Sequence, residues 1–555
     1  MSKLRGHLRA GFLAIVVVLG PLSQVSPAQG DDQPMRGIVW AVPSSFPELR
    51  AELEDLADHG AEAVRVGLVL DPSAYVLSQM HGIRLFQEVD LAYYPASRMA
   101  ARVDEISAEI DSALAVAATT PVEIFIGLGY WNDTSSEDAC DVLAQLTRVV
   151  KKAGPSAKTY YITPFIENDR CADVVDFVLL DVRLSQNPEL LIERWRAAHD
   201  TPVGIAALGA SVHPGAGSGF LVPRSPESQA RYLERTLGDL VDDQNLIALF
   251  VDRWAERDPE RLRSVDIDGD YGIMDPDGSA RPAAAVVKGF FTGGQRVFAF
   301  SAGNAPTEDY SWINLMAFIA AVLFGFTYYG SLGLQSVLRR YFLSHSFYLE
   351  KVGDARETTT GMTLFLLFCF SLAASIVGTT LVTHLETTNL WIAITEWSPR
   401  WVSLSLRAGA TYPGFLVIAF SVLFAGVSLL WAVVLSVVTR GTKGLKLNQT
   451  LLIVVLPRWP VALIGLLSLV VLNWHIDAPG IVIVGLTGSW LTVVMIYTGR
   501  MFSDYLRLLG ITAMWTIPVL VLALGLAAGT GWLMVSTQDL MPEISFLWNL
   551  ATLAG

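Results

Sequence analysis

The chain changes composition near residue 310, and this change limits what it can fold into more than any other feature. Of the 53 acidic residues, 44 lie between Asp31 and Asp309 and only 9 follow. After Trp312 the sequence consists mainly of long apolar runs separated by short basic loops. Because one solvent cannot suit both compositions, the sequence predicts a water-soluble half followed by a membrane half.

The formal net charge of -14 comes from the first half, because the second half has slightly more basic than acidic residues. A strongly acidic surface argues against binding to nucleic acid and against docking on anionic lipid, since both would be repelled. The simpler interpretation is a solvated surface that keeps this half soluble. We therefore expect no nucleic-acid partner.

The N-terminus has the pattern of an export signal. A basic start, from Lys3 to Arg9, is followed by the short apolar segment 11–22 and by small residues up to Ala28. This order is typical of a secretory signal peptide, and an uncleaved anchor is the alternative. The domains expected from these features are a signal peptide at 1–28, an extracytoplasmic domain at 29–308 and a membrane domain at 309–555.

Three cysteines are too few for a disulfide scaffold. Cys140 and Cys171 both lie in the half expected to be exported, where an oxidising compartment would allow them to pair. Two unrelated buried thiols are the alternative, because the sequence does not give their separation. Cys369 lies within an apolar run and is expected to pack there.

Six apolar runs in the second half are each close to the ~20 residues that a membrane-crossing helix needs. Basic residues such as Arg339, Lys443 and Arg507 follow the first, third and fifth runs. This alternation predicts a multi-pass protein of a bacterial inner membrane, with the soluble domain and the C-terminus outside and the lipid bilayer as a partner. The expected spans are 311–333, 361–383, 412–438, 450–473, 479–498 and 509–534.

Arg458, between Pro457 and Pro460, is the one ionisable residue well inside an expected span. Such residues are functional hypotheses, and a side chain that reaches back to the interface is the alternative. The spans carry neither a proton relay nor a row of gating charges, so acid–base transport is unsupported. The last five spans, with the basic segment 339–356, resemble Yip-type membrane domains, which implies a scaffold.

In the first half, β-branched apolar strands alternate with helical periodicity, as in residues 98–115. Eight strands with helical crossovers over about 260 residues predict a closed (β/α)8 barrel, that is, an α/β TIM-barrel fold. The expected strands are 37–40, 62–70, 83–89, 122–127, 159–165, 177–182, 203–207 and 246–251.

Residues 36–292 also resemble the barrel of family 2 glycoside hydrolases, through six motifs in the same order and with similar spacing. The resemblance implies the barrel of an enzyme that hydrolyses glycosidic bonds. A retaining enzyme of this kind needs two carboxylates about 5 Å apart. The motifs are 63–66, 82–89, 94–95, 127–129, 202–210 and 271–275 with 281–283.

The two catalytic positions of that family do not carry carboxylates here. The acid/base glutamate aligns with Trp131 and the nucleophilic glutamate with Ala207. Asp133 as acid with Asp252 as base is the best remaining pair, because both follow predicted strands. An ion pair between Asp252 and Arg253 at the barrel mouth is the alternative to a catalytic Asp252.

Aromatic residues near strand ends predict a glycan platform, because sugar faces pack on aromatic rings while polar groups hold the hydroxyls. The alternative is that these rings cap the barrel core. We expect no cofactor and no metal. The acidic loop 266–270 resembles the start of a calcium loop, but Tyr271 stands where that loop needs glycine, so a solvated loop is the preferred interpretation and calcium the alternative. The candidate ligand-binding residues are Trp40, Tyr130, Trp131, Glu167, Asp181 and Trp254.

The sequence thus favours a glycosidase-like barrel without hydrolytic activity, which binds a glycan or a protein outside the membrane and is fused to a membrane scaffold. An active glycosidase with rearranged carboxylates is the first alternative. An accessory component of a transport or envelope-assembly complex, with protein partners in the membrane, is the second.

Overall fold

The structure is a computed structural model of the whole chain. It describes residues 33–120, 122–183, 185, 187–212, 217–255, 271–275, 277–304, 311–354, 360–386, 413–439, 445–473 and 479–509, short pieces between 391 and 409, and Phe546. The expected signal peptide and the acidic loop 266–270 lie outside the described residues. So does almost all of the sixth expected span.

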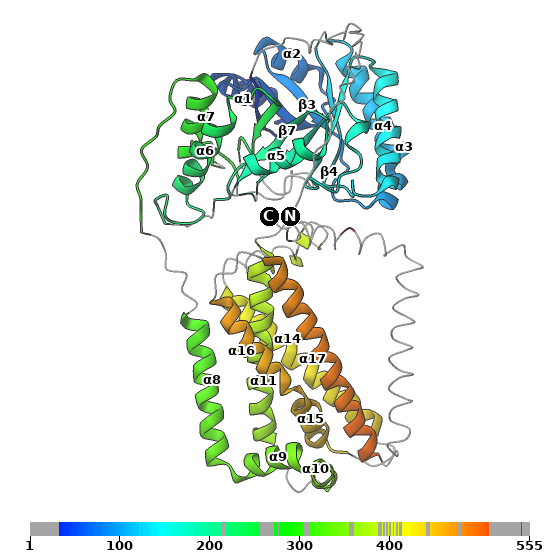
Figure 1. The fold of residues 1–555 in the computed structure, drawn as a ribbon, viewed down its shortest axis with the longest axis vertical. Coiled ribbons are helices and arrows are strands. Elements are labelled where there is room, and N and C mark those ends of the chain that lie inside the picture. Colours follow the sequence, from blue (N-terminus) through cyan, green and yellow to red (C-terminus); the bar gives the residue numbers. More distant parts are fainter. Residues whose placement is uncertain are drawn as a thin grey trace, which may run out of the picture.

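Eight parallel strands close into a barrel in sequence order, with β1 paired to both β2 and β8 (Figure 1). The predicted barrel is therefore confirmed. The strands are β1 Met35–Val39, β2 Ala63–Gly67, β3 Arg84–Glu88, β4 Phe125–Tyr130, β5 Lys158–Thr163, β6 Phe177–Asp181, β7 Val203–Leu208 and β8 Leu246–Val251.

Seven helices follow the strands and cover the outside of the barrel. Several begin at a capping side chain followed by proline: Ser45, Asp71, Asn187 and Ser225 each accept a backbone N–H of the first turn. Between β5 and β6 the described chain forms only the 3-10 helix η1 (Ala172–Val174) instead of an α-helix. The helices are α1 Phe46–Asp58, α2 Pro72–Met80, α3 Ala96–Ala117, α4 Glu137–Ala153, α5 Pro188–Ala198, α6 Pro226–Leu240 and α7 Pro282–Thr292.

Two separate apolar cores result from the alternation of side chains along each strand. Residues such as Ile38 and Val64 point outward and pack against the helices. Large aromatic residues fill the barrel interior, where the Phe86 and Phe125 rings stack with centroids 4.1 Å apart and Tyr160 packs beside Phe177. The barrel is therefore a packed core and has no pore along its described length.

The second half is entirely helical in its described part. Four helices are long and apolar enough to cross a membrane, namely α8, α11, α14 and α17. The helices are α8 Ser311–Gly330, α9 Leu332–Leu343, α10 His345–Gly353, α11 Thr360–Leu385, α14 Pro413–Thr439, α15 Leu447–Val455, η3 Leu456–Arg458, α16 Pro460–Leu472 and α17 Pro479–Leu508.

The expected fourth span is not one straight helix. Leu447–Arg458 and Pro460–Leu472 are bent against each other by 42°, and together they count as a fifth candidate span by length and composition. Pro457 and Pro460 explain the break, because proline removes a backbone donor and its ring clashes with the preceding turn. The expected number of six spans is not confirmed by the described residues.

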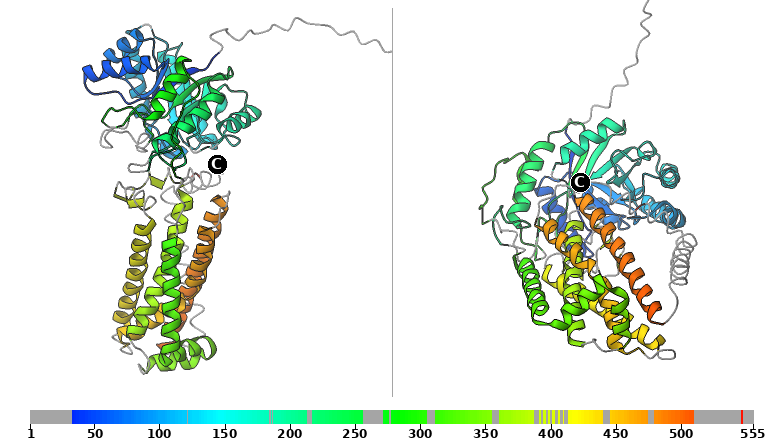
Figure 2. Two further views of the ribbon diagram at one scale, coloured as in Figure 1. Left: turned by 90° about the vertical axis from the view of Figure 1, so that its left-hand side faces the viewer. Right: turned by 60° about the horizontal axis from the view of Figure 1, so that its bottom comes forward.

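Helix α11 lies at the centre of the helical half. Its apolar window is 67% buried, against 6% for α8, 17% for α14 and 22% for α17. The peripheral helices therefore expose long apolar faces. These faces include Phe326 on α8 and Ile418 on α14. Helices α9 and α10 lie at the end of this half that is farthest from the barrel, as Figures 1 and 2 show.

The side of the barrel at which the strands end faces the helical half. Arg224, in the connection between β7 and α6, pairs with Glu386, which directly follows α11. Phe546, close to the end of the chain, is fully buried in the interior cluster of the barrel, 6.3 Å between ring centroids from Phe165. These contacts place the barrel mouth toward the helices.

Candidate functional site at the barrel mouth

The carboxyl ends of β4, β6 and β8 bring together Tyr130 and Trp131, Asp181 and Arg183, and Asp252. In barrels of this fold, chemistry takes place at this end of the strands. All five side chains are almost completely buried. The mouth is therefore filled by its own polar and aromatic groups.

Asp181 is the centre of this cluster. One of its oxygens, Oδ2, accepts hydrogen bonds from the Tyr130 hydroxyl at 2.5 Å, from Trp131 Nε1 at 3.0 Å and from Arg183 at 2.7 Å. Burial alone would raise the pKa of Asp181, but the charge of Arg183 and the hydrogen bonds from Arg183 and Tyr130 outweigh it and hold the pKa below its ordinary value of 3.8. Asp181 is thus an ionised, fully partnered carboxylate.

Arg183 also binds the second carboxylate of the mouth. Its Nη1 lies 3.3 Å from Asp252, which in turn is 3.4 Å from Arg253. The ion pair proposed as the alternative role of Asp252 is therefore present. Arg183 completes the cluster by lying over the rings of Tyr130 and Tyr271.

Arg183 was not singled out from the sequence, although a signal for it exists. Asp181 and Arg183 are two residues apart at the end of a strand, and extended backbone places such side chains on the same face. The spacing could have predicted their ion pair.

A second ion pair lies deeper in the barrel. Arg65, on β2, is 2.8 Å from Glu88 at the end of β3, and it also donates to the carbonyl of Ala206. Its side chain is only 3% exposed and contacts the ring of Tyr130. Arg65 and Glu88 therefore tie β2, β3 and β7 together.

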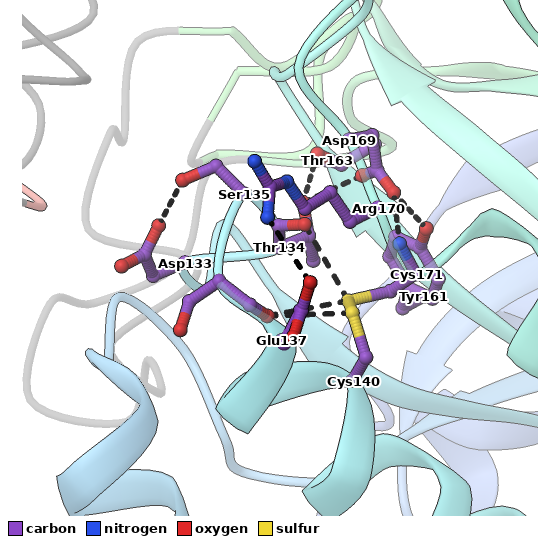
Figure 3. Close-up of a disulfide and its surroundings, with 11 residues drawn as sticks. Asp133, Thr134, Ser135, Glu137, Cys140, Tyr161, Thr163, Asp169, Arg170 and Cys171 are labelled. Carbon is purple, nitrogen blue, oxygen red and sulfur yellow. Dashed lines mark hydrogen bonds and ion pairs between the residues drawn. A yellow bond between two sulfur atoms is a disulfide. The ribbon is translucent and has the colours of Figure 1, made fainter.

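Asp133 lies in the loop between β4 and α4. Its Oδ1 accepts from the Ser135 hydroxyl at 2.6 Å, and Figure 3 shows it directed away from the neighbouring disulfide. In the described part of the chain, Asp133 forms no ion pair. Asp133 is therefore a carboxylate near the mouth that has no cation among the described residues.

Hydrogen bonds to Asp169 and a disulfide hold the loop that carries Asp133 in place. Thr134 and Tyr161 donate to Asp169 at 2.5 and 2.6 Å, and Cys171 is joined to Cys140 by a disulfide (Figure 3). Burial raises the pKa of Asp169, and the hydrogen bonds from Thr134 and Tyr161 oppose the increase. The question left open by the sequence is thus decided in favour of a Cys140–Cys171 bond.

Three other candidate ligand-binding residues lie away from the mouth cluster. Glu167 is 58% exposed and pairs with Arg194 at 2.9 Å. Trp40 and Trp254 belong to the core between strands and helices; Trp40 donates to Glu52 on α1 at 2.7 Å. These placements match the alternative in which the rings complete a core.

The two family positions that should carry carboxylates lie where the alignment placed them, at strand ends. Trp131 directly follows β4, is 1% exposed and has φ of 52°, in the left-handed region. Its backbone N–H donates to Ile162 at 2.8 Å, which helps to hold this strained conformation. Ala207, near the end of β7, is fully buried. Neither side chain can donate a proton to a leaving group or attack an anomeric carbon.

Within the described residues, no group of three or more His, Cys, Asp or Glu side chains could hold a metal ion. The prediction that no metal or cofactor takes part stays a prediction, because the acidic loop is outside this part of the chain.

No protein-family model matches the sequence. No curated protein matches it either. Similar solved structures include a family 2 β-galacturonidase from Eisenbergiella tayi bound to galacturonate, with 15% identity, 48% of this chain and 52% of that chain covered, and a TM-score of 0.43. A β-D-glucuronidase from Dictyoglomus thermophilum has 12% identity, the same coverage and a TM-score of 0.41.

The chain thus spans about half the length of these enzymes. At these identities and TM-scores the likeness tells nothing about activity. The barrel assignment comes from the strand order and pairing of this chain itself.

Proposed function

We propose that this protein is a non-catalytic, glycosidase-like barrel that is held at a membrane by a helical scaffold and acts as a binding module. The observation that carries the proposal is the pair Trp131 and Ala207 at the positions where the resembled family needs its two carboxylates. Asp252, the base of the best remaining pair, shares Arg183 with the neighbouring Asp181. An acid catalyst needs a raised pKa, and that of Asp181 is lowered.

The burial of the aromatic rings favours a protein over a glycan as the bound partner. A sugar platform needs an exposed ring face, whereas Trp40, Tyr130, Trp131 and Trp254 are at most 4% exposed. Phe546 further covers the interior of the mouth. The outer faces of the barrel, rather than its mouth, are thus the better candidates for a protein contact.

The charge distribution of the helical half supports an extracytoplasmic barrel. Arg339, Arg340 and Lys351 lie on α9 and α10, at the end of the helices away from the barrel (Figure 1). Basic residues favour the cytoplasmic side. The Cys140–Cys171 bond agrees with an oxidising compartment on the barrel side.

Hydrolysis assays on the full chain in detergent test the proposal. We expect no turnover of aryl β-glucuronides, β-galacturonides or β-galactosides above the rate without protein. A matched pair, Asp133→Ala and Glu167→Ala, serves as the control for any activity that appears. Turnover that Asp133→Ala abolishes and Glu167→Ala preserves would refute a non-catalytic barrel.

Such a result would support the second candidate, an active glycosidase with rearranged carboxylates. One observation favours it, since Asp133 is held by Ser135 and has no ion-pair partner in the described chain.

A further inference from the structure

The helical half contains a cavity of about 310 Å³ between α11, α14 and α17. Its walls are mainly apolar, and the lining residues of α14 and α17 come from the middle of those helices. Two of them, Leu423 and Val427, are also exposed on the outer face of the described helices. The cavity therefore reaches the surface that we assign to lipid.

One cation lines this apolar cavity. Arg458 is 2% exposed, so its side chain is buried and does not reach back to an interface as the alternative from the sequence supposed. Its guanidinium carbon lies 5.0 Å from the ring centroid of Tyr497 and 5.6 Å from that of Phe424. One terminal nitrogen donates to the carbonyl of Val454.

The hydrogen-bonding capacity of Arg458 is not used up. Its Nε has no partner among the described residues, and the lining of the cavity contains no Asp or Glu. This differs from Arg65 and Arg183 in the barrel, which each pair with carboxylates. Among the described residues this buried cation has no anion, which is costly, and a charge inside a membrane span marks a candidate ligand or ion site.

The bend in the fourth span places Arg458 next to the start of α16, although no residue of α16 lines the cavity itself. Arg458 ends η3, and α16 starts two residues later at Pro460. The N-terminus of a helix carries a partial positive charge, and interrupted membrane helices use such ends to bind anions. The guanidinium and this helix terminus are therefore neighbours along the chain, at the break.

We propose that this cavity binds the anionic group of an amphiphile, a phosphate or a carboxylate on an apolar chain. The anion would meet Arg458, and the chain would lie against Phe420, Leu423 and Val427 on α14. A small free anion would leave the apolar walls unused. The proposal does not depend on what the barrel binds.

Native mass spectrometry of the full chain released from detergent tests the proposal. The probes are phosphatidylglycerol and oleate as anionic amphiphiles, phosphatidylcholine as the zwitterionic comparison, and inorganic phosphate as a competitor. We expect the anionic amphiphiles to bind about tenfold more tightly than phosphatidylcholine, because the choline cation of phosphatidylcholine offsets the charge that its phosphate presents to Arg458. Comparing the first two probes distinguishes a phosphodiester from a carboxylate.

Three variants assign the binding to the cavity. Arg458→Gln is expected to lose about tenfold in affinity, Arg458→Lys to retain most of it, and the matched control Arg339→Gln, at an exposed arginine of α9, to bind like the native chain. Equal binding by Arg458→Gln and the native chain would overturn the proposal. Equal binding of both lipid classes would do so too, as would displacement of the lipid by inorganic phosphate.

A fourth variant covers the case in which Arg458→Gln does not fold. Val494→Trp fills the cavity from α17 and leaves the arginine in place. We expect it to elute as a folded protein and to lose the anionic lipid. A folded Val494→Trp chain that still binds phosphatidylglycerol as the native chain does would place the lipid elsewhere and reject the site.

Discussion

The two halves of the molecule treat buried charge in opposite ways. In the barrel, Arg183 binds Asp181 and Asp252, and Arg65 binds Glu88, so each buried arginine is matched by carboxylates of the same domain. In the helical half, Arg458 is equally buried but contacts aromatic rings and one carbonyl. The difference separates charges that hold a fold together from a charge that is available to a ligand.

Substitution of Arg183 is the strongest test of the proposal that buried charges in the barrel stabilise its fold. Arg183→Met leaves Asp181 buried without its cation and leaves Asp252 with Arg253 alone, and we expect a loss of about 3–5 kcal/mol in the free energy of unfolding. Urea denaturation followed by tryptophan fluorescence measures it. The matched control is Arg194→Met, which breaks the exposed pair with Glu167 and should cost less than about 1 kcal/mol. Similar losses in both variants would contradict a structural role for the buried network.

The disulfide should have the next largest effect. Its cysteines are 31 residues apart, so chain entropy predicts that Cys140→Ser with Cys171→Ser lowers the free energy of unfolding by about 3–4 kcal/mol. Cys369→Ser is the control, since Cys369 is a free thiol in the helical half. Labelling of the unfolded, unreduced chain with maleimide should modify one cysteine; modification of all three would show that the bond is not formed.

Removal of the contact between Phe546 and the barrel should have the third largest effect. Phe546→Ala removes a fully buried phenyl group, and we expect its contact with the barrel to weaken by about 2 kcal/mol. Hydrogen–deuterium exchange near Phe165 should then become faster. The control is Phe326→Ala, at a ring that is 75% exposed. Equal exchange rates near Phe165 in both variants would contradict the burial of Phe546 in the barrel.

Protonation of Asp181 should have the smallest effect on the free energy of unfolding, because it occurs only at low pH. The pKa of Asp181 in the folded barrel lies below its ordinary value of 3.8, so the unfolded chain takes up the proton first. The stabilisation is complete well above pH 3.8 and is lost as the pH falls through the folded pKa. We expect Asp181→Asn to unfold with a weaker pH dependence below about pH 4, and an unchanged dependence would contradict the ionised pair.

Much of the candidate site could be predicted from its sequence, and the reason differs from residue to residue. Trp131 and Ala207 could be placed at strand ends because strand order and motif spacing are local properties, and both lie there. Asp252 could be placed at the mouth, but not its bond to Arg183, which joins β6 to β8. Trp40 and Trp254 were expected at the mouth, and their side chains lie in the outer core instead, because strand alternation decides the face.

The sequence by itself determined the division near residue 310, the closed eight-stranded barrel and the presence of Trp131 and Ala207 where the resembled family has carboxylates. These follow from composition, periodicity and residue identity, each of which is read along the chain. Only the tertiary structure decided that Cys140 meets Cys171, that Phe546 enters the barrel, and that Arg458 lines a cavity instead of reaching the interface. Each of these depends on packing between segments far apart in sequence, and no local pattern encodes those distances.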